Sequence, residues 1–536
     1  MNFFILGVIA IFLIAYFTYG KFLEKNYQVK ETEDVPSKKL YDGVDFVPTN
    51  KFVLLGHHFS SIAGAGPIVG PILAGLVFGW LPAILWIVLG TIFIGGVHDF
   101  SSLIISIRHK GASIAEVANK YINKRTYKIF LLFIWLALVY VVAVFTDLTA
   151  DTFFNEPSVA EISIYYIFIA IIFGILVYRV KLNLAFSTLL SLTLILAGIF
   201  FSLKFQFLFL PKTLWIIALL FYCFIASIIP VWFLLQPRDY LSSYFLYFTV
   251  IIGLLGLLFG NTSITYPAFI SFNSSLGPLF PFLFITIACG AISGFHSLVS
   301  SGTTSKQIDS IKNSRFITYG GMILEGIVAA ISLSTLMMLK GKGLTNPQEI
   351  YAEGISRFAS IFHINLEIGK RIGYLAISAF ILTTLDTATR ISRYIFQEFF
   401  GITKSSLLIR SFSTIVSLIL PLILLNLKLR DLSGNIVPCW KIIWPLFGTT
   451  NQLLAALVLL IIYLWIKKEK YRNKVSVLIP AIFMLIVTIS ALIYTLYMKI
   501  NKGLFDVITI IGVILLILSG FIIFETIRYV KEKGYH

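Results

Sequence analysis

The sequence predicts an all-α protein that crosses a membrane about fifteen times. Of its 536 residues, 58% are hydrophobic and only 12% are charged, and the mean hydropathy is +0.92. A soluble protein usually carries about 25% charged residues, roughly twice this share. Several apolar runs also exceed the roughly 18 residues that mark a membrane-spanning helix. The composition and these runs together exclude a conventional soluble fold.

The apolar runs predict the following spans in order: 3–20, 53–79, 80–108, 127–151, 160–180, 184–204, 211–235, 239–261, 278–302, 316–340, 367–399, 404–427, 440–466, 473–498 and 503–527. The first run lacks the basic start and the small-residue cleavage site of a signal peptide, so we expect it to remain as a helix. Because the stretches between the spans are short, we expect residues 1–536 to form a single membrane domain.

Two of the apolar segments are interrupted by glycine and proline. The first interruption is Gly64–Pro67, followed by Gly70–Pro71, and the second is Gly290–His296. A membrane helix keeps its backbone hydrogen bonds internal because hydrocarbon offers no other partner, so a break is tolerated only against protein or a water-filled cavity. Two such breaks in one chain are typical of secondary transporters, whose substrate lies between half-helices.

The two broken segments open two groups of five spans, 53–204 and 278–466, which is the layout of an inverted repeat. Inversion requires the two broken helices to cross the membrane in opposite directions. An odd number of spans runs from the first broken helix up to the second, so this condition is met. We therefore expect a five-plus-five inverted repeat with extra peripheral helices at 3–20, 211–261 and 473–527.

The distribution of charge predicts the orientation. The net charge is +17, but the positive residues lie in short loops between apolar spans, which is the positive-inside pattern rather than a nucleic-acid surface. The loops after 80–108 and 440–466 are basic, whereas the loop after 127–151 is acidic. This pattern places the N-terminus outside the cytoplasmic (inner) membrane and the C-terminus inside. Basic residues that this scheme leaves outside are Lys340, Lys342, Lys428 and Arg430.

The richest polar stretch within a span is Thr383–Arg390. Ionisable groups inside a membrane are costly and are functional candidates by default. Asp386 and Arg390 are four residues apart on one helical face, so an ion pair between them is geometrically easy. The stretch either pins helix ends through this pair, or binds a coupling cation or relays a proton through Thr383, Thr384 and Asp386.

Histidines gather near both breaks. His57 and His58 open the first broken helix, His98 and Asp99 lie deep in the next span, and His296 follows the second break. An imidazole titrates near neutral pH and can carry or gate a proton, whereas histidines that only satisfy exposed backbone would be structural. Two histidines with a carboxylate would also suit zinc. We expect no bound metal and no cofactor.

Small polar residues flank both breaks. The N-termini of half-helices carry partial positive charge and free N–H groups, which suit a carboxylate ligand. The alternative is that these residues only allow close packing of helices. We expect the substrate to lie against Ser61, Gly64, Ala65, Gly66, Ser293, Gly294, His296 and Ser297.

Two further features carry less information. The amides of Asn451 and Gln452 stand in an apolar run and either find partners across a helix interface or line a site. The three cysteines, Cys223, Cys289 and Cys439, are scattered, so the sequence supports neither a disulfide framework nor a thiolate metal site.

Eight strings, distributed in order over most of the chain, resemble the carbon starvation protein A family of transporters. They are Asp42–Asn50, Gly56–Phe59, Ala63–Pro67, Val97–Phe100, Ser293–His296, Ser300–Thr304, Leu382–Arg390 and Trp444–Gly448. The resemblance implies uptake of peptides, or of pyruvate in some members, with proton coupling. It also implies a relation to the amino acid–polyamine–organocation (LeuT-like) transporters, which share a five-plus-five inverted repeat. By that analogy, Thr383, Thr384 and Asp386 would face a cation at Ser61–Gly66.

We therefore expect a secondary active transporter of the carbon starvation response, which imports peptides or a small carboxylate such as pyruvate and is not an enzyme. Its expected partners are that substrate, a proton or a sodium ion, and membrane lipid, with no nucleic acid. The alternatives are an intramembrane metal-dependent enzyme and a nutrient-sensing channel. The enzyme is disfavoured because no histidine is followed by glutamate, as an HExxH zinc site requires.

Overall fold

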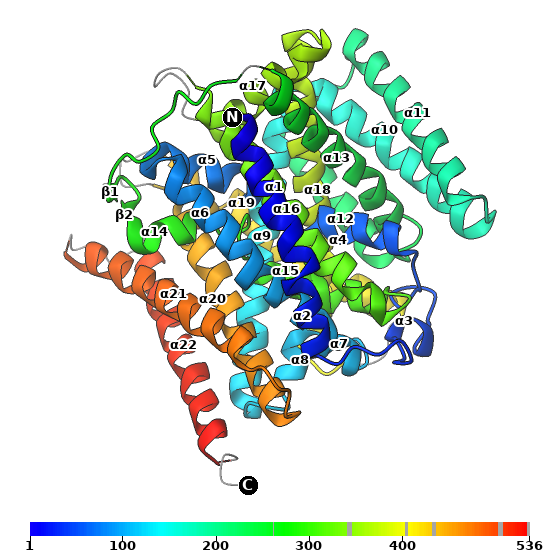
Figure 1. Ribbon diagram of the computed structural model, residues 1–536. Helices are drawn as coiled ribbons and strands as arrows, with labels where there is room; N and C mark the ends of the chain where they lie inside the picture. Colours follow the sequence, from blue (N-terminus) through cyan, green and yellow to red (C-terminus); the bar gives the residue numbers. More distant parts are fainter. Residues whose placement is uncertain (261, 340–345, 403–405, 431–435, 502–506, 533–536) are drawn as a thin grey trace.

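The computed structural model describes residues 1–260, 262–339, 346–402, 406–430, 436–501 and 507–532. It is a bundle of α-helices in which α10 and α11 lie at one edge and α21 and α22 lie at the opposite edge (Figure 1). Residues 261, 340 and 342, and the first residues of the spans expected at 404–427 and 503–527, lie outside the described residues.

The helices of the first part of the chain are α1 (Asn2–Phe17), α2 (Tyr19–Asn26), α3 (Pro36–Lys39), α4 (Lys51–Ala63), α5 (Gly66–Phe78), α6 (Trp80–Gly90), α7 (Gly96–Arg108), α8 (Ile114–Ala118), α9 (Lys124–Asn155), α10 (Pro157–Gly174), α11 (Leu184–Lys204), α12 (Lys212–Ile228) and α13 (Leu235–Phe259). Those of the second part are α14 (Leu279–Thr286), α15 (Gly294–Gly302), α16 (Gly320–Met337), α17 (Pro347–Ala359), α18 (Leu366–Phe399), α19 (Leu407–Asn426), α20 (Cys439–Lys468), α21 (Val475–Asn501) and α22 (Val507–Glu532).

Short elements complete the chain. The strands β1 (Asn273–Ser274) and β2 (Gly277–Pro278) pair antiparallel, as do β3 (Lys428–Arg430) and β4 (Ile436–Pro438). A π-helical turn, Thr91–Gly95, joins α6 to α7 within one span. The remaining turns are the π-helical Ile175–Arg179 and Arg315–Tyr319 and the 3-10 turns Thr304–Lys306, Ile311–Asn313 and Ser360–Phe362.

Among the described residues, 13 helices are long and apolar enough to cross a membrane. The two other expected spans correspond to the shorter apolar helix α12, which has 17 residues, and to the pair of short helices α14 and α15. The predicted all-α membrane fold is confirmed. Helix α1 begins near the top of the molecule in Figure 1, and α22 reaches its bottom.

The first predicted break separates α4 from α5. The side chain of Asn50 caps the start of α4 by accepting a hydrogen bond from the Phe52 N–H at 2.9 Å. The helix ends at Ala63, and Gly64 adopts φ +41° and ψ −153°, a conformation that favours glycine. Pro67 stands in the first turn of α5, where its missing N–H leaves no hydrogen bond unmade.

The second predicted break separates α14 from α15, and other helices satisfy part of its exposed backbone. The Thr91 hydroxyl donates to the Gly290 carbonyl at 3.3 Å. The Asn451 side-chain oxygen, from α20, accepts a hydrogen bond from the Phe295 N–H at 3.1 Å. Neighbouring side chains therefore replace some of the intrahelical partners that the break removes, as a break at membrane depth requires.

The two breaks touch each other. A Cβ atom added at Gly66 would lie 2.0 Å from the Cβ of Cys289, and one added at Gly70 would lie 2.5 Å from the carbonyl oxygen of Thr286. Gly290 lies in turn against Pro67 and Pro71. Glycines are needed here because the two interrupted backbones approach more closely than side chains would permit.

Candidate functional site

The half-helix α4 lies between two groups of buried polar side chains. One group joins α4 to α12, α13 and α18, and we call it the Asp239 network: His57, Ser61, Tyr222, Arg238, Asp239, Thr383, Thr384, Asp386 and Thr387. The other joins α7, α15 and α16, and we call it the Glu325 cluster: His98, Asp99, His296 and Glu325. Apart from the half-buried Tyr222, all of these residues are buried.

In the Asp239 network, α4 is attached to the start of α13. The His57 Nδ1 atom lies 2.6 Å from the Asp239 Oδ2 atom. The Ser60 hydroxyl donates to the Asp239 backbone carbonyl at 3.0 Å, and the Ser61 hydroxyl lies 3.5 Å from Oδ2 of the same residue. Gln307 approaches the far nitrogen of His57 at 3.4 Å. Asp239 is thus the main polar contact between the two helices.

Helix α18 lies directly against the first break. The Thr384 hydroxyl donates to the Ser61 carbonyl at 3.1 Å, and the Thr387 hydroxyl lies 3.2 Å from the Ser61 hydroxyl. A Cβ atom at Gly64 would lie 3.0 Å from Thr384 Oγ1. Thr384 therefore faces Ser61–Gly66, as the resemblance implies.

Thr383 and Asp386 face α13 instead. The guanidinium of Arg238 forms an ion pair with Asp386 and donates to the Thr383 hydroxyl at 2.6 Å. The Tyr222 hydroxyl donates to Asp386 Oδ2 at 2.7 Å and accepts from Arg238 at 2.9 Å. Both charges are completely buried and reach across from different helices.

Asp386 and Arg390, which the spacing allows to pair, do not pair with each other, because among the ion pairs of the described residues each side chain has another partner. Arg390 donates to Asp45 at 2.8 Å, and it also contacts the Ala226 carbonyl at 2.7 Å. Spacing along α18 permits the local pair, but Arg238 neutralises Asp386 from α13 and Asp45 neutralises Arg390 from the loop before α4.

Asp45 ties the loop before α4 to α18. Its carboxylate accepts hydrogen bonds from Arg390 at 2.8 Å, from the Tyr394 hydroxyl at 2.7 Å and from Arg393 at 3.2 Å. Burial alone would raise the pKa of the Asp45 carboxyl, but the positive charges of Arg393, Arg390 and Lys306 outweigh it and hold this pKa well below its usual range. The loop is therefore held to α18 as long as Asp45 is ionised.

In the Glu325 cluster, His296 lies between two carboxylates. Its Nδ1 atom is 3.3 Å from Asp99 Oδ2, and its Nε2 atom is 3.6 Å from Glu325 Oε2. The neighbouring His98 Nδ1 atom lies 3.1 Å from the other oxygen of Asp99. The structure therefore brings the predicted residues His98, Asp99 and His296 together around a glutamate that the sequence did not indicate.

His58 points away from its neighbour His57. Its Nδ1 atom lies 2.9 Å from the Thr304 hydroxyl, and its ring packs against α16, where a Cβ atom at Gly321 would be 3.1 Å away. Successive helical residues differ by about 100° in direction. The two histidines of α4 therefore face the two different polar groups.

The residues predicted to hold the substrate lie in three environments. Ser61, Gly64, Ala65 and Gly66 lie at the first break, against α18 and the second break. At the start of α15, the Ser293 hydroxyl accepts from the Asn451 amide at 2.8 Å. Gly294 packs on the Asn451 backbone, and the Ser297 hydroxyl donates to the Gly294 carbonyl at 2.7 Å. His296 belongs to the Glu325 cluster.

Sequence reasoning missed four members of these groups: Tyr222, Arg238, Asp239 and Glu325. Arg238 falls between two expected spans and Asp239 is the first residue of the second, so neither stood out as a charge inside a span, whereas the structure places both in the first turns of α13. Glu325 stands alone in an apolar span, which is itself a sign of function. Tyr222 carries no such signal, because tyrosine is common in membrane helices.

The zinc alternative finds no support in the geometry. Across the described ranges, no group of three or more histidine, cysteine, aspartate or glutamate side chains could hold a metal ion.

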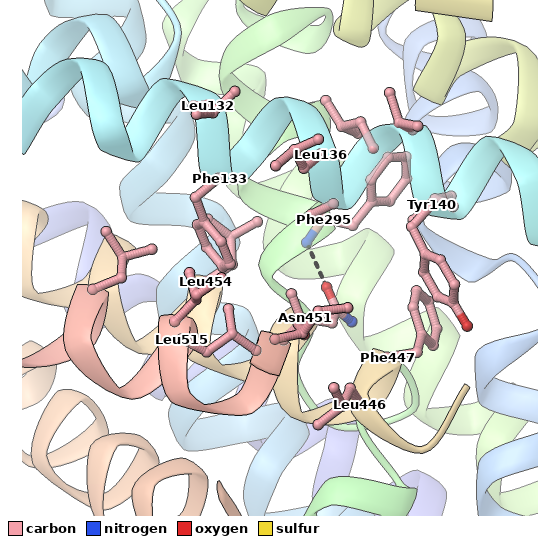
Figure 2. Close-up of a pocket in the computed structure, with 18 of the residues that line it drawn as sticks. Leu132, Phe133, Leu136, Tyr140, Phe295, Leu446, Phe447, Asn451, Leu454 and Leu515 are labelled. Carbon is pink, nitrogen blue, oxygen red and sulfur yellow. Dashed lines mark hydrogen bonds between the residues drawn. The ribbon is translucent and has the colours of Figure 1, made fainter. Parts of the chain in front are cut away.

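An apolar cavity of about 400 Å³ lies beside the second break. Figure 2 shows Phe295 and Asn451 at its centre, with α9 above them carrying Phe133 on the left and Tyr140 on the right, and with Leu515 from α22 on the left. The dashed line in this view is the hydrogen bond from the Phe295 N–H to Asn451.

Two half-helix pairs in contact, surrounded by buried polar groups within an apolar bundle, define a polytopic membrane transport protein. The chain belongs to the carbon starvation protein CstA family, because the model of that family matches residues 1–345 and 341–491.

Individual relatives agree with this membership. The chain is 31% identical over 568 residues to the peptide transporter CstA of Escherichia coli (strain K12), covering 91% of this chain and 80% of that protein. It is 30% identical over 587 residues to the pyruvate/proton symporter BtsT of the same strain, with the same two coverages of 91% and 80%. A solved manganese transporter of Eremococcus coleocola shares the fold, with a TM-score of 0.52, 12% identity and coverage of 92% of this chain and 99% of that one.

Proposed function

We propose that this protein imports peptides, or a small carboxylate such as pyruvate, across the cytoplasmic membrane, and that inward movement of protons drives the import. Two observations together carry the proposal. The two broken helices touch each other, and the Asp239 network and the Glu325 cluster, both buried, lie beside them. The names of the relatives, peptide transporter and pyruvate/proton symporter, support the choice of substrate and ion. The family name supports a role in carbon starvation.

The proposed architecture is the five-plus-five inverted repeat. Residues 53–204 would form the first repeat and 278–466 the second, with peripheral helices at 3–20, 211–261 and 473–527. Loop charges support an N-terminus outside and a C-terminus inside. Rocking of one group of helices against the other would then expose the breaks to each side in turn.

The substrate carboxylate would bind where the half-helices begin. The N-termini of α5 and α15 carry partial positive charge. Ser61, Gly64, Ala65 and Gly66 would contact it from one break, and Ser293, Gly294, His296 and Ser297 from the other. Since Asn451 covers the start of α15 in this conformation, binding there would displace its side chain.

The coupling proton would be handled by the buried polar groups on either side of α4. The candidates from the sequence are His57, His58, His98, Asp99, Thr383, Thr384 and Asp386. A sodium ion is the second candidate, and a group of oxygen atoms at the first break favours it. The Ser61 carbonyl oxygen lies 3.1 Å from the Thr384 hydroxyl, and the Ser61 hydroxyl lies 3.2 Å from the Thr387 hydroxyl and beside the carboxylate of Asp239. Hard cations prefer such oxygen ligands.

Uptake by the purified protein in liposomes tests the proposal. Labelled pyruvate and a labelled dipeptide would be offered separately, with the pH gradient and the sodium gradient imposed one at a time and protein-free liposomes as the control. We expect accumulation above the external concentration with the pH gradient alone. Accumulation only with sodium would favour the second candidate, and purely downhill flux would favour a channel.

A further inference from the structure

Glu325 is the one carboxylate of the two polar groups that has neither a strong hydrogen bond nor a permanent cation among the described residues. It lies in the middle of α16 and is completely buried. Neither of its oxygen atoms has a hydrogen-bond partner within the described part of the chain. Its one ion-pair partner among the described residues is the His296 Nε2 atom, at 3.6 Å. Burying an ionised carboxylate in this way is costly, so the site favours a carboxyl group that carries a proton.

His296 can pass a proton between Glu325 and Asp99. One nitrogen of its ring faces each carboxylate, at 3.6 Å and 3.3 Å. An imidazole can accept a proton on one nitrogen and release another from the opposite nitrogen. Both ring nitrogens lie close to acceptors without forming hydrogen bonds among the described residues, so neither carboxylate holds the ring in a fixed hydrogen bond.

The charge of the cluster is not fixed by any permanent cation. The titratable groups that face it are His98 and Asp99 from α7, His296 from α15, His58 from α4 and Cys289 from the second break. No lysine or arginine forms an ion pair with any of these in the described ranges. In the Asp239 network, by contrast, Arg238 holds a permanent positive charge against Asp386.

We propose that Glu325, relayed by His296 to Asp99, is the group that binds and releases the transported proton. This inference rests on the proposed proton coupling and names the residue that performs it. A proton from water on one side of the membrane binds the Glu325 carboxylate. When Glu325 releases it to His296 Nε2, His296 Nδ1 releases its own proton to Asp99, from which one proton passes to water on the other side, so each O–H or N–H bond broken is matched by one formed. Protonation removes the buried negative charge beside His296. Loss of the proton restores that charge and favours access of water to the Glu325 cluster.

The test is a comparison of Glu325→Gln with wild-type protein in liposomes. Glutamine has the shape of a protonated glutamate but cannot release a proton. One coupled proton under a gradient of one pH unit supports about tenfold accumulation, or 1.36 kcal/mol. We expect this accumulation to vanish in Glu325→Gln, while exchange of labelled for unlabelled substrate without a gradient continues. The matched control Glu367→Gln, at an exposed glutamate of α18, should behave as wild type.

The outcomes separate the two proposals. If substrate accumulation by wild-type protein does not respond to the pH gradient, the proposed proton coupling is refuted. If wild-type protein responds and Glu325→Gln accumulates substrate equally well, the role of Glu325 is refuted while the coupling stands.

A second measurement covers the case in which Glu325→Gln does not fold. An apolar carbodiimide reacts with protonated carboxyl groups, and mass spectrometry of wild-type protein identifies the labelled residue. Labelling at Glu325 that decreases as the pH rises supports the inference. Labelling elsewhere only, or labelling at Glu325 that does not depend on pH, overturns it.

Discussion

The guanidinium of Arg238 and the carboxylate of Asp386 form a completely buried ion pair between α13 and α18. Tyr222 and Thr383 complete the hydrogen bonds of the pair. Because the next residue, Asp239, holds His57 of α4, the pair and this contact join three helices through two consecutive residues. Removal of either charge would leave the other buried and uncompensated.

Asp386→Asn should therefore abolish proton-driven uptake while the protein still inserts into the membrane. Loss of one partner of a buried pair costs about 3–5 kcal/mol, so the thermal midpoint in detergent should fall as well. Unlike Glu325→Gln, this variant should also lose substrate exchange, because the position of α18 against the first break is disturbed. Full accumulation by Asp386→Asn would remove Asp386 from the mechanism.

The double variant Arg238→Gln, Asp386→Asn is the control for the ion pair itself. Removing both charges leaves no uncompensated charge, so part of the lost stability should return, by at least about 1 kcal/mol of coupling energy. If the double variant loses more unfolding free energy than the two single variants lose together, the pair does not act as a unit.

Asp45→Asn should destabilise the protein in a pH-dependent way. The folded-state pKa of Asp45 is lowered, so its contribution is present above the unfolded value of about 3.9 and is lost as the pH falls below it. The difference in thermal midpoint between wild type and Asp45→Asn should be constant near neutral pH and should shrink below about pH 4.

Asp34→Asn is the matched control, because Asp34 forms an exposed ion pair with Lys39, in which the side chains are 64% and 65% exposed. Such pairs contribute about 0–1 kcal/mol. An equal effect of the two substitutions at pH 7 would contradict the assignment of Asp45 as the tie between the loop and α18.

Gly66→Ala should disrupt the contact between the two breaks. The added methyl group would lie 2.0 Å from the Cys289 Cβ atom, and overpacking of this kind costs about 1–3 kcal/mol. We expect a lower thermal midpoint and slower uptake. The further change Cys289→Gly should restore part of both, since it removes the clashing side chain.

Gly7→Ala serves as the comparison, because no atom lies within 4 Å of a Cβ at Gly7 in the middle of α1. Alanine is about 1 kcal/mol more favourable than glycine in a helix interior, so this variant should be neutral or slightly more stable. A similar loss in both variants would argue against a specific contact between the breaks.

Asn451→Leu should weaken the start of α15. It removes the acceptor of the Phe295 N–H and the donor to Ser293 (Figure 2). An unsatisfied buried donor costs about 1–3 kcal/mol, so stability should decrease, and uptake with it. Asn451→Asp keeps the acceptor and should retain more stability than Asn451→Leu; the reverse order would contradict this role of the amide.

The positions of both breaks could be predicted from the sequence because glycine and proline determine backbone geometry locally. Gly64 tolerates the positive φ of the first break, and Pro67 suits the first turn of the helix that follows it. The apolar spans follow in the same way from length and hydrophobicity, without knowledge of their neighbours.

The pairing of charges could not be predicted, because it depends on which helices meet. Spacing along α18 suggested Asp386 with Arg390, yet the partners are Arg238 and Asp45, separated from them by 148 and 345 residues. The role of Glu325 likewise depends on a contact between helices, because His296 of α15 lies beside it. The sequence alone indicates that a charged residue inside a span is a functional candidate, but it does not indicate which other charged residue is its partner.

His57 and His58 are consecutive residues of one short half-helix, yet His57 contacts Asp239 of α13 and His58 contacts Thr304. A rotation of this half-helix would therefore change both contacts together, because the two histidines share one rigid turn of backbone.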